Sequence, residues 1–490
     1  SLGYAPVMVR KDSIWFPLSV TFAVALLVYL YTLSSSIGWH DSAELALTAW
    51  LPTINHAPGS PVHNLLNYLP ARLFTEPYLA TNFMSALAAA LSVAVLAALI
   101  MALVGDALIA VLCAVLFGVS FQVWASAVTT EIYSLGLMFL AGAMLAGWYW
   151  HTDQRRFSWW LMLLSYGLAT GAYFANILLW PAFAFLIYKS SEKNAAAPFL
   201  ALIRFGLFGL AMVVLIASVN FLLAGQMLPF GAVRPQSIAE LLTYMSGAQY
   251  EPLQARSGGA WRLVEHASIF GKSLLYLPVI FAFAGWIALL RAQATYAWFT
   301  AFIFAIYIGY YTVFGSGDYY LMVNPAYFVC MLWAGYGAHW VSQKLPVRNR
   351  LLPVYALLLL LVVAQLYTQL EGRRMMAADK SAERFTAETF EFLPQDAVAI
   401  VGWRELTPLV YQQTVHGKRP DIRFVLPAMT RRYYAHGSLD DYASFVDRVA
   451  CDYPVFTMKP AAELNMESEV VAGPVEAVWR RIVPGVSPCE

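Results

Sequence analysis

The residues best suited to chemistry lie in the stretch Gly38–Tyr68, which reads GWHDSAELALTAWLPTINHAPGSPVHNLLNY. Asp41 and Glu44 are three residues apart, so on a helix their carboxylates face the same way. A turn-rich break, HAPGSP, then begins at His56, and His63 follows it. A carboxylate placed here can act as a general base and take the proton from an incoming hydroxyl. The alternative is a packing loop, but acidic and imidazole groups at a membrane face are costly unless they serve a function.

Two further chemistries are open to this stretch. One is a divalent metal held by Asp41, Glu44 and His56, although these residues show no fixed ligand spacing. The other is stabilisation of a phosphate leaving group, which needs positive or hydrogen-bonding partners. The candidate partners on the same side of the membrane, given the topology below, are His56, His63, Arg72, Arg234, Arg256, Arg262 and Lys272.

Two more acidic residues stand at the ends of predicted membrane segments. Glu131 lies in TTEIYSL and Asp318 lies in GSGDYY. With Asp41 and Glu44 they fall on one face of the membrane. Each carboxylate alone is better explained as a structural group, but the four together favour a shared cleft. The sequence contains no nucleophile elbow, no HExxH and no CxxC, so hydrolase and zinc-protease chemistries are not indicated.

The composition is that of a polytopic membrane protein. Of 490 residues, 60% are hydrophobic and only 12% are charged, whereas about a quarter is usual in soluble proteins. The net charge of +1 gives no reason to expect a nucleic acid as a partner. Segments of about 20 mostly apolar residues are long enough to span a bilayer. Eleven are predicted, at 14–36, 79–103, 107–125, 131–150, 158–172, 174–188, 199–223, 269–290, 296–314, 321–343 and 351–370.

Basic residues occupy alternate loops between these segments, which places the N-terminus in the cytoplasm. The loops 37–78 and 225–267 then lie outside. The first should form two interfacial helices, Ser42–Leu51 and Pro61–Leu73, because apolar residues recur on one face of each. The second contains a predicted short helix, Ser237–Ser246.

Beyond residue 370 the chain has the pattern of a soluble domain. Expected helices alternate with apolar β runs, which predicts a small parallel α/β domain over 371–490, outside the membrane domain 1–370. Cys451 and Cys489 both lie there; they pair if the domain is extracytoplasmic, and two free thiols are the equal alternative. The expected helices are 378–393, 405–415 and 439–450, and the expected strands are 397–401, 422–426 and 455–458.

Several motifs, taken in order along the chain, resemble those of a bacterial family of multispan proteins. That family is related to the animal membrane O-mannosyltransferases and belongs to the GT-C glycosyltransferases. WHDSAELALTAW and HAPGSPVHNLL resemble its acidic and His-Pro-Pro-Gly motifs. The others are TTEIYSL, GLATGAYFAN, GSGDYYLMVNPAY and VHGKRPDIRFV.

The resemblance implies a GT-C-like membrane fold, a polyprenyl-phosphate sugar donor and inversion at the anomeric carbon. It implies that Asp41 is the catalytic base, and that Glu44 is its neighbour, a metal ligand or an acceptor contact. His56, His63 and Arg234 would contact the donor phosphate. The residues expected to line the cleft are Glu131, Tyr133, Asn176, Asp318 and Tyr320.

The resulting prediction is a glycosyltransferase of the bacterial inner membrane that acts on a hydroxyl of an extracytoplasmic protein, lipid or glycan. The first alternative is a transporter or flippase of a lipid-linked substrate. Such proteins place charged or broken helices at mid-membrane and show pseudo-repeats, whereas the acidic residues here gather at one face. The second alternative is a scaffold whose outer domain recruits partners.

Overall fold

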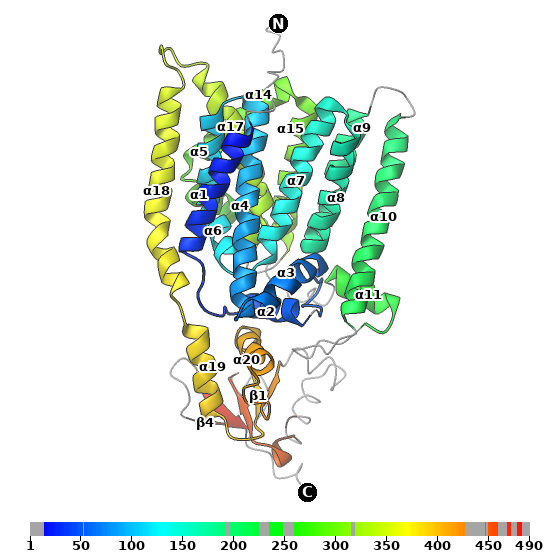
Figure 1. Ribbon diagram of the computed structural model, residues 1–490, viewed down its shortest axis with the longest axis vertical. Helices are drawn as coiled ribbons and strands as arrows, with labels where there is room; N and C mark the ends of the chain where they lie inside the picture. The colour runs from blue at the N-terminus through cyan, green and yellow to red at the C-terminus, as the bar shows by residue number, and fades with distance from the viewer. Residues whose placement is uncertain are drawn as a thin grey trace.

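The computed structural model describes residues 14–51, 53–191, 197–224, 235–247, 259–314, 319–426, 446, 449–458, 468–471 and 478–482. Long helices form a bundle, and a smaller mixed α and β part adjoins one end of it (Figure 1). The short helices α2, α3 and α11 lie at that same end. Helices α2 and α3, which belong to the stretch singled out for chemistry, therefore lie next to the C-terminal part of the chain.

Within the described residues, every regular element of the N-terminal half is a helix: α1 (Trp15–Tyr31), α2 (Asp41–Trp50), α3 (Pro61–Leu73), α4 (Pro77–Val104), α5 (Ala107–Gly118), α6 (Phe121–Val128), α7 (Ile132–Asp153), α8 (Arg156–Ala172), the 3-10 helix η2 (Phe174–Leu179), α9 (Trp180–Ser190) and α10 (Ala197–Leu223). The later helices are α11 (Ile238–Ser246), α13 (Trp261–Ser273), α14 (Leu277–Ala292), α15 (Ala294–Val313), α16 (Tyr319–Met322), α17 (Asn324–Ser342), α18 (Leu352–Ala377), α19 (Ser381–Phe392) and α20 (Trp403–His416).

The three helices expected in the outer loops are confirmed. α2 begins at Asp41, and its first turn carries two carboxylates, which the positive end of the helix dipole favours. α3 begins with Pro61, a residue suited to the first helical position because it needs no hydrogen-bonded N–H there. Ser237 caps α11 by accepting a hydrogen bond from the Glu240 amide.

The eleven expected spans are not confirmed, although each expected segment contains a helix. Five described helices are long and apolar enough to cross a membrane, or seven if each bent helix pair counts as one span. The pair α5–α6 bends by 67° and the pair α13–α14 by 107°. In the second pair, Leu275 and Tyr276 both have positive φ and bend the chain sharply within the span that was predicted over 269–290.

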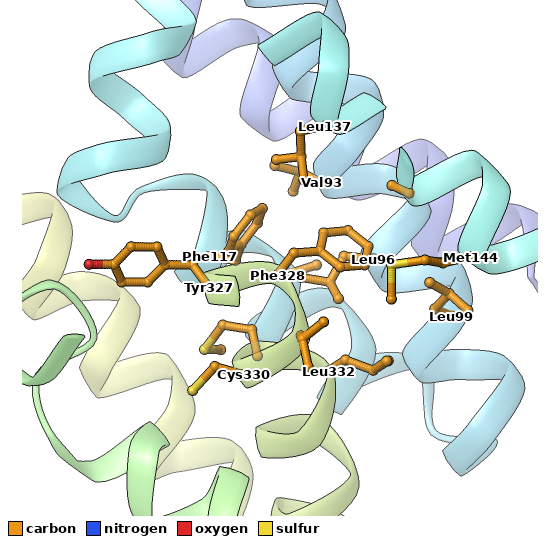
Figure 2. Close-up of a cluster of buried hydrophobic side chains, with 14 of the residues drawn as sticks. Val93, Leu96, Leu99, Phe117, Leu137, Met144, Tyr327, Phe328, Cys330 and Leu332 are labelled. Carbon is orange, nitrogen blue, oxygen red and sulfur yellow. The ribbon is translucent and has the colours of Figure 1, made fainter. Parts of the chain in front are cut away.

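The centre of the bundle is a core contributed mainly by α4, α5, α7 and α17 (Figure 2). Phe117 and Phe328 pack edge to face there, with ring centroids 5.7 Å apart. Helices α14 and α17 approach so closely that small residues are required. A Cβ on Gly285 would lie 1.9 Å from the Trp333 carbonyl oxygen, and one on Gly337 would lie 1.9 Å from that of Phe281. Such small-residue contacts are typical of helix pairs in membranes.

The C-terminal part contains a five-stranded sheet in the order β2-β1-β3-β5-β4. The three strands predicted from apolar runs are present, and both neighbours of β1 pair with it in parallel. The sheet as a whole is mixed rather than parallel, because β4 and β5 pair antiparallel to each other and β5 runs antiparallel to β3. The helix predicted over 439–450 lies largely outside the described residues. The strands are β1 (Val398–Ile400), β2 (Arg423–Val425), β3 (Val455–Thr457), β4 (Ser468–Val471) and β5 (Trp479–Ile482).

Candidate functional site

Asp41 and Glu44 lie on the first turn of α2, but they sit in different environments. The Asp41 side chain is 29% exposed, whereas that of Glu44 is 2% exposed. The helix therefore turns one carboxylate toward an accessible surface and buries the other. Two acidic groups in such contrasting surroundings are suited to different roles, one reactive and one supporting.

His56 lies between the two carboxylates. Its backbone amide donates a hydrogen bond of 2.6 Å to Glu44 Oε1, and its ring Nδ1 lies 2.5 Å from Glu44 Oε2. The other ring nitrogen, Nε2, faces Asp41 Oδ2 at 3.7 Å. An ionised Glu44 only accepts hydrogen bonds, so it fixes the proton on Nδ1 and turns Nε2 toward Asp41. The three side chains form a chain in the order Glu44, His56, Asp41.

Burial raises the pKa of Glu44 above its ordinary value, because the charged form loses its hydration. The opposing influence is His56, whose charge and hydrogen bonds favour the ionised carboxylate. Burial and His56 therefore act on the Glu44 carboxylate in opposite directions.

These three residues are also the candidate metal site among the described residues, since one ligand atom from each lies within 4.8 Å of the others. The hydrogen bonding does not fit all three residues as ligands of one ion. The two ring nitrogens of His56 face different carboxylates, and a single metal ion binds only one of them. Both Glu44 oxygens already accept hydrogen bonds from His56. We therefore derive no step through a metal.

Trp403 is a member of this site that the sequence did not reveal. Its indole Nε1 donates a hydrogen bond of 2.7 Å to Asp41 Oδ1, and its ring meets His56 edge on at 5.7 Å. Trp403 begins α20, 362 positions along the chain from Asp41. The one available signal is its place just after strand β1, at the carboxyl end of parallel strands where functional residues gather.

Glu131 lies next to the first turn of α2. Ser42 Oγ donates a hydrogen bond of 2.9 Å to the Thr130 carbonyl, which holds the start of α7 against α2. Tyr133, two residues further, is buried, and its ring packs edge to face on Tyr173 with centroids 5.2 Å apart. Of this pair, Glu131 is thus the residue placed near the Asp41 cluster.

The expected contribution of His63 is not supported by its surroundings. Its side chain is 1% exposed, and burial lowers its pKa from 6.5 to about 4. A neutral buried imidazole supplies no positive charge to a phosphate.

The pKa of His63 gives a prediction for stability. Because the folded-state pKa of about 4 lies below the ordinary 6.5, the unfolded state binds the extra proton as pH falls below 6.5. Acidification from pH 7 to pH 5 should therefore cost the wild type about 2 kcal/mol through this residue. We expect the melting temperature of the His63→Gln variant in detergent to fall less over this range. An identical fall in both proteins would contradict the assignment.

The contacts of Asn176 and Tyr320 are with other residues than the Asp41 cluster. Asn176 is buried, accepts a hydrogen bond of 2.6 Å from Tyr307 and donates one of 2.9 Å to the Ala169 carbonyl, so it ties helices together. Tyr320 lies on α16, beside a cavity of about 370 Å³ among α6, α13 and α18. The residues lining that cavity are Phe121, Gln122, Ile269, Lys272, Ser273, Tyr320 and Gln369.

Arg234, Asp318 and Cys489 lie outside the described residues. Cys451 is disulfide-bonded, whereas Cys113 and Cys330 are free and buried. The C-terminal part therefore contains an oxidised cysteine, and the bundle contains reduced ones.

Comparison with known proteins relates the chain to glycosyltransferases. Residues 41–196, 156 of the 490, match the family model of the protein O-mannosyl-transferase TMEM260 N-terminal domain. A search of curated proteins finds no match to the chain.

Solved structures share the fold. ArnT from Cupriavidus metallidurans in the apo state superposes with a TM-score of 0.58 at 14% identity, covering 96% of this chain and 98% of that one. The same enzyme bound to undecaprenyl phosphate gives a TM-score of 0.54 at 11% identity, with coverages of 96% and 99%. The Archaeoglobus fulgidus oligosaccharyltransferase, in complex with Zn and sulfate, gives 0.50 at 12% identity over 89% of this chain and 67% of that one. The resemblance predicted from the sequence is therefore confirmed: residues 41–196 match an O-mannosyl-transferase family model, and the chain shares the fold of ArnT and of the oligosaccharyltransferase.

Proposed function

We propose that the protein is an inverting glycosyltransferase that moves a sugar from a polyprenyl-phosphate donor to a hydroxyl of an extracytoplasmic acceptor. The observation that carries the proposal is the accessible Asp41 carboxylate, supported from behind by the buried Glu44–His56 pair. The family match begins at Asp41, and a structure of the same fold was solved with undecaprenyl phosphate bound. The bound undecaprenyl phosphate in that structure supports a lipid-linked donor.

Asp41 is the general base in this proposal. Trp403 occupies Oδ1, so Oδ2 is the oxygen that accepts the proton from the acceptor hydroxyl. The acceptor oxygen then bonds to the anomeric carbon from one face. The bond from that carbon to the phosphate oxygen breaks on the other face, which inverts the configuration and releases polyprenyl phosphate. His56 Nε2 lies 3.7 Å from Oδ2, and Arg234 remains a candidate contact for the leaving phosphate.

The same proposal sets the protein in a bacterial inner membrane, with its N-terminus in the cytoplasm. Residues 1–370 would form the membrane catalytic domain and 371–490 an extracytoplasmic domain. The disulfide at Cys451 supports an oxidising location for the C-terminal part. The C-terminal part lies at the same end of the bundle as α2, α3 and α11, which supports a shared outer face (Figure 1).

The test uses the full chain in sealed vesicles with a membrane extract as the source of acceptor. Mannose labelled on undecaprenyl phosphate is supplied in one sample and as its nucleotide sugar in another. We expect label to leave the lipid and enter a new product, with no product from the nucleotide sugar. Direct use of the nucleotide sugar would contradict the proposed donor, and lipid-linked mannose that crosses the bilayer without forming product would favour a transporter.

A further inference from the structure

The C-terminal part of the chain is packed against the first outer loop through a common apolar core. Polar contacts tie the same surfaces together: Trp39 Nε1 donates a hydrogen bond of 2.9 Å to Ser381 Oγ, and His416 Nε2 lies 3.3 Å from Glu76 Oε2. The buried apolar residues shared by the two parts include Ile37, Ala43, Ala46, Leu47 and Tyr78 from the loop side, and Phe385, Phe390, Leu406, Leu409 and Trp479 from the C-terminal side.

This shared core fixes the position of α20 relative to α2. Leu406 and Leu409, in the first two turns of α20, belong to the same buried cluster as Ala43 and Leu47 of α2. Trp403 is the first residue of α20, and its indole reaches Asp41 in the first turn of α2. Helices α2 and α20 lie next to each other (Figure 1). The side chain that reaches Asp41 is therefore held by packed helices at both ends of the contact, and not by a loop.

The contact itself is directional. An indole N–H only donates, and a carboxylate is its best acceptor because the hydrogen bond is assisted by charge. At 2.7 Å the Trp403–Asp41 bond has full strength. The bond fixes the side-chain torsion of Asp41. That side chain is 29% exposed, and its contact with His56 is longer, at 3.7 Å. With Oδ1 held, Oδ2 keeps a constant direction.

We infer that the C-terminal part completes the catalytic centre, with Trp403 as a positioning residue that orients the Asp41 carboxylate. The inference rests on the proposed function, since it assigns Trp403 a role only if Asp41 is the base. A misplaced general base loses rate without losing substrate affinity, because its contribution arises in the transition state. Loss of this orientation should therefore lower kcat and leave KM unchanged.

The first test is Trp403→Phe in the full-length protein, which keeps an aromatic ring against His56 and removes the N–H. We expect kcat for transfer from undecaprenyl-phosphate mannose to fall about tenfold with KM unchanged. The matched control is Trp39→Phe. It removes the other indole donor across the same interface, to Ser381, without touching Asp41. Equal losses in the two variants, or a change confined to KM, would overturn the positioning role.

A second replacement tests whether a loss of activity in the phenylalanine variant comes from misfolding. Benzothienylalanine at position 403 has the shape of tryptophan with sulfur in place of the N–H. We expect it to preserve the melting temperature and to show the same loss of kcat. An unchanged kcat in this protein would overturn the inference.

Asp41→Asn, measured in the same assay, separates the inference from the function on which it rests. Transfer by that variant would contradict the proposed base. An inactive Asp41→Asn together with wild-type rates in both position-403 proteins would contradict the role of Trp403 alone.

Discussion

Replacing Asp41 with asparagine is expected to lower the rate of glycosyl transfer by about 10²–10⁴-fold, the usual contribution of a general base. An asparagine side chain has the size of aspartate but cannot take the acceptor proton at neutral pH. Its amide oxygen can still accept the hydrogen bond that Trp403 donates to Oδ1, so the contact between α2 and α20 should persist. The measurement is turnover of labelled undecaprenyl-phosphate mannose by the full-length protein, with the melting temperature as a check of folding.

The matched control is Asp396→Asn. Asp396 is an exposed carboxylate of the C-terminal part with φ of 58°, a conformation that asparagine accepts readily. This variant should transfer sugar at the wild-type rate. Full activity in Asp41→Asn would remove the proposed base, and equal losses in both variants would point to a general effect of lost charge.

The second large effect is expected from Glu44→Gln, at roughly 100-fold in kcat. The backbone amide of His56 always donates, so the glutamine carbonyl should take the 2.6 Å bond to that amide. The glutamine NH₂ then faces Nδ1 and forces it to accept. The imidazole proton moves to Nε2, which reverses the tautomer that faces Asp41. In serine proteases, replacing the catalytic aspartate leaves the histidine in the wrong tautomer and causes a loss of this kind.

The control for this variant is Glu391→Gln, which makes the same chemical change on the exposed face of α19. Activity is measured as before, and the folding check is again the melting temperature. A Glu44→Gln protein that is folded and fully active would show that the buried carboxylate does not act through His56.

The local structure around the site was predictable from the sequence, because short-range signals determine it. The period of apolar residues gave α2 and α3, and the serine before Ile238 marked the start of α11. The bent segments were not predictable. The 67° bend joins two apolar helices, α5 and α6, and the 107° turn depends on positive φ at Leu275 and Tyr276, which are neither glycine nor asparagine. Packing imposes those conformations, and no local pattern records them.

The site was predictable in part. Carboxylates three residues apart on a helix pointed to Asp41 and Glu44. The position of His56 between them depends on how the segment after α2 folds back, which residue types alone do not determine. The bond from Trp403 joins residues 362 positions apart, and a tryptophan beyond a short strand resembles any core residue. Strand β5 was missed for a similar reason: WRRI contains two adjacent arginines and gives no apolar run.

The most direct measurement is a structure of the full-length protein with polyprenyl phosphate bound. The account predicts phosphate density beside Asp41 and His56, between the loops 37–78 and 225–267, with the isoprenoid chain leaving toward the bilayer. Phosphate bound at the opposite end of the bundle, or a site closed off from Asp41, would contradict it.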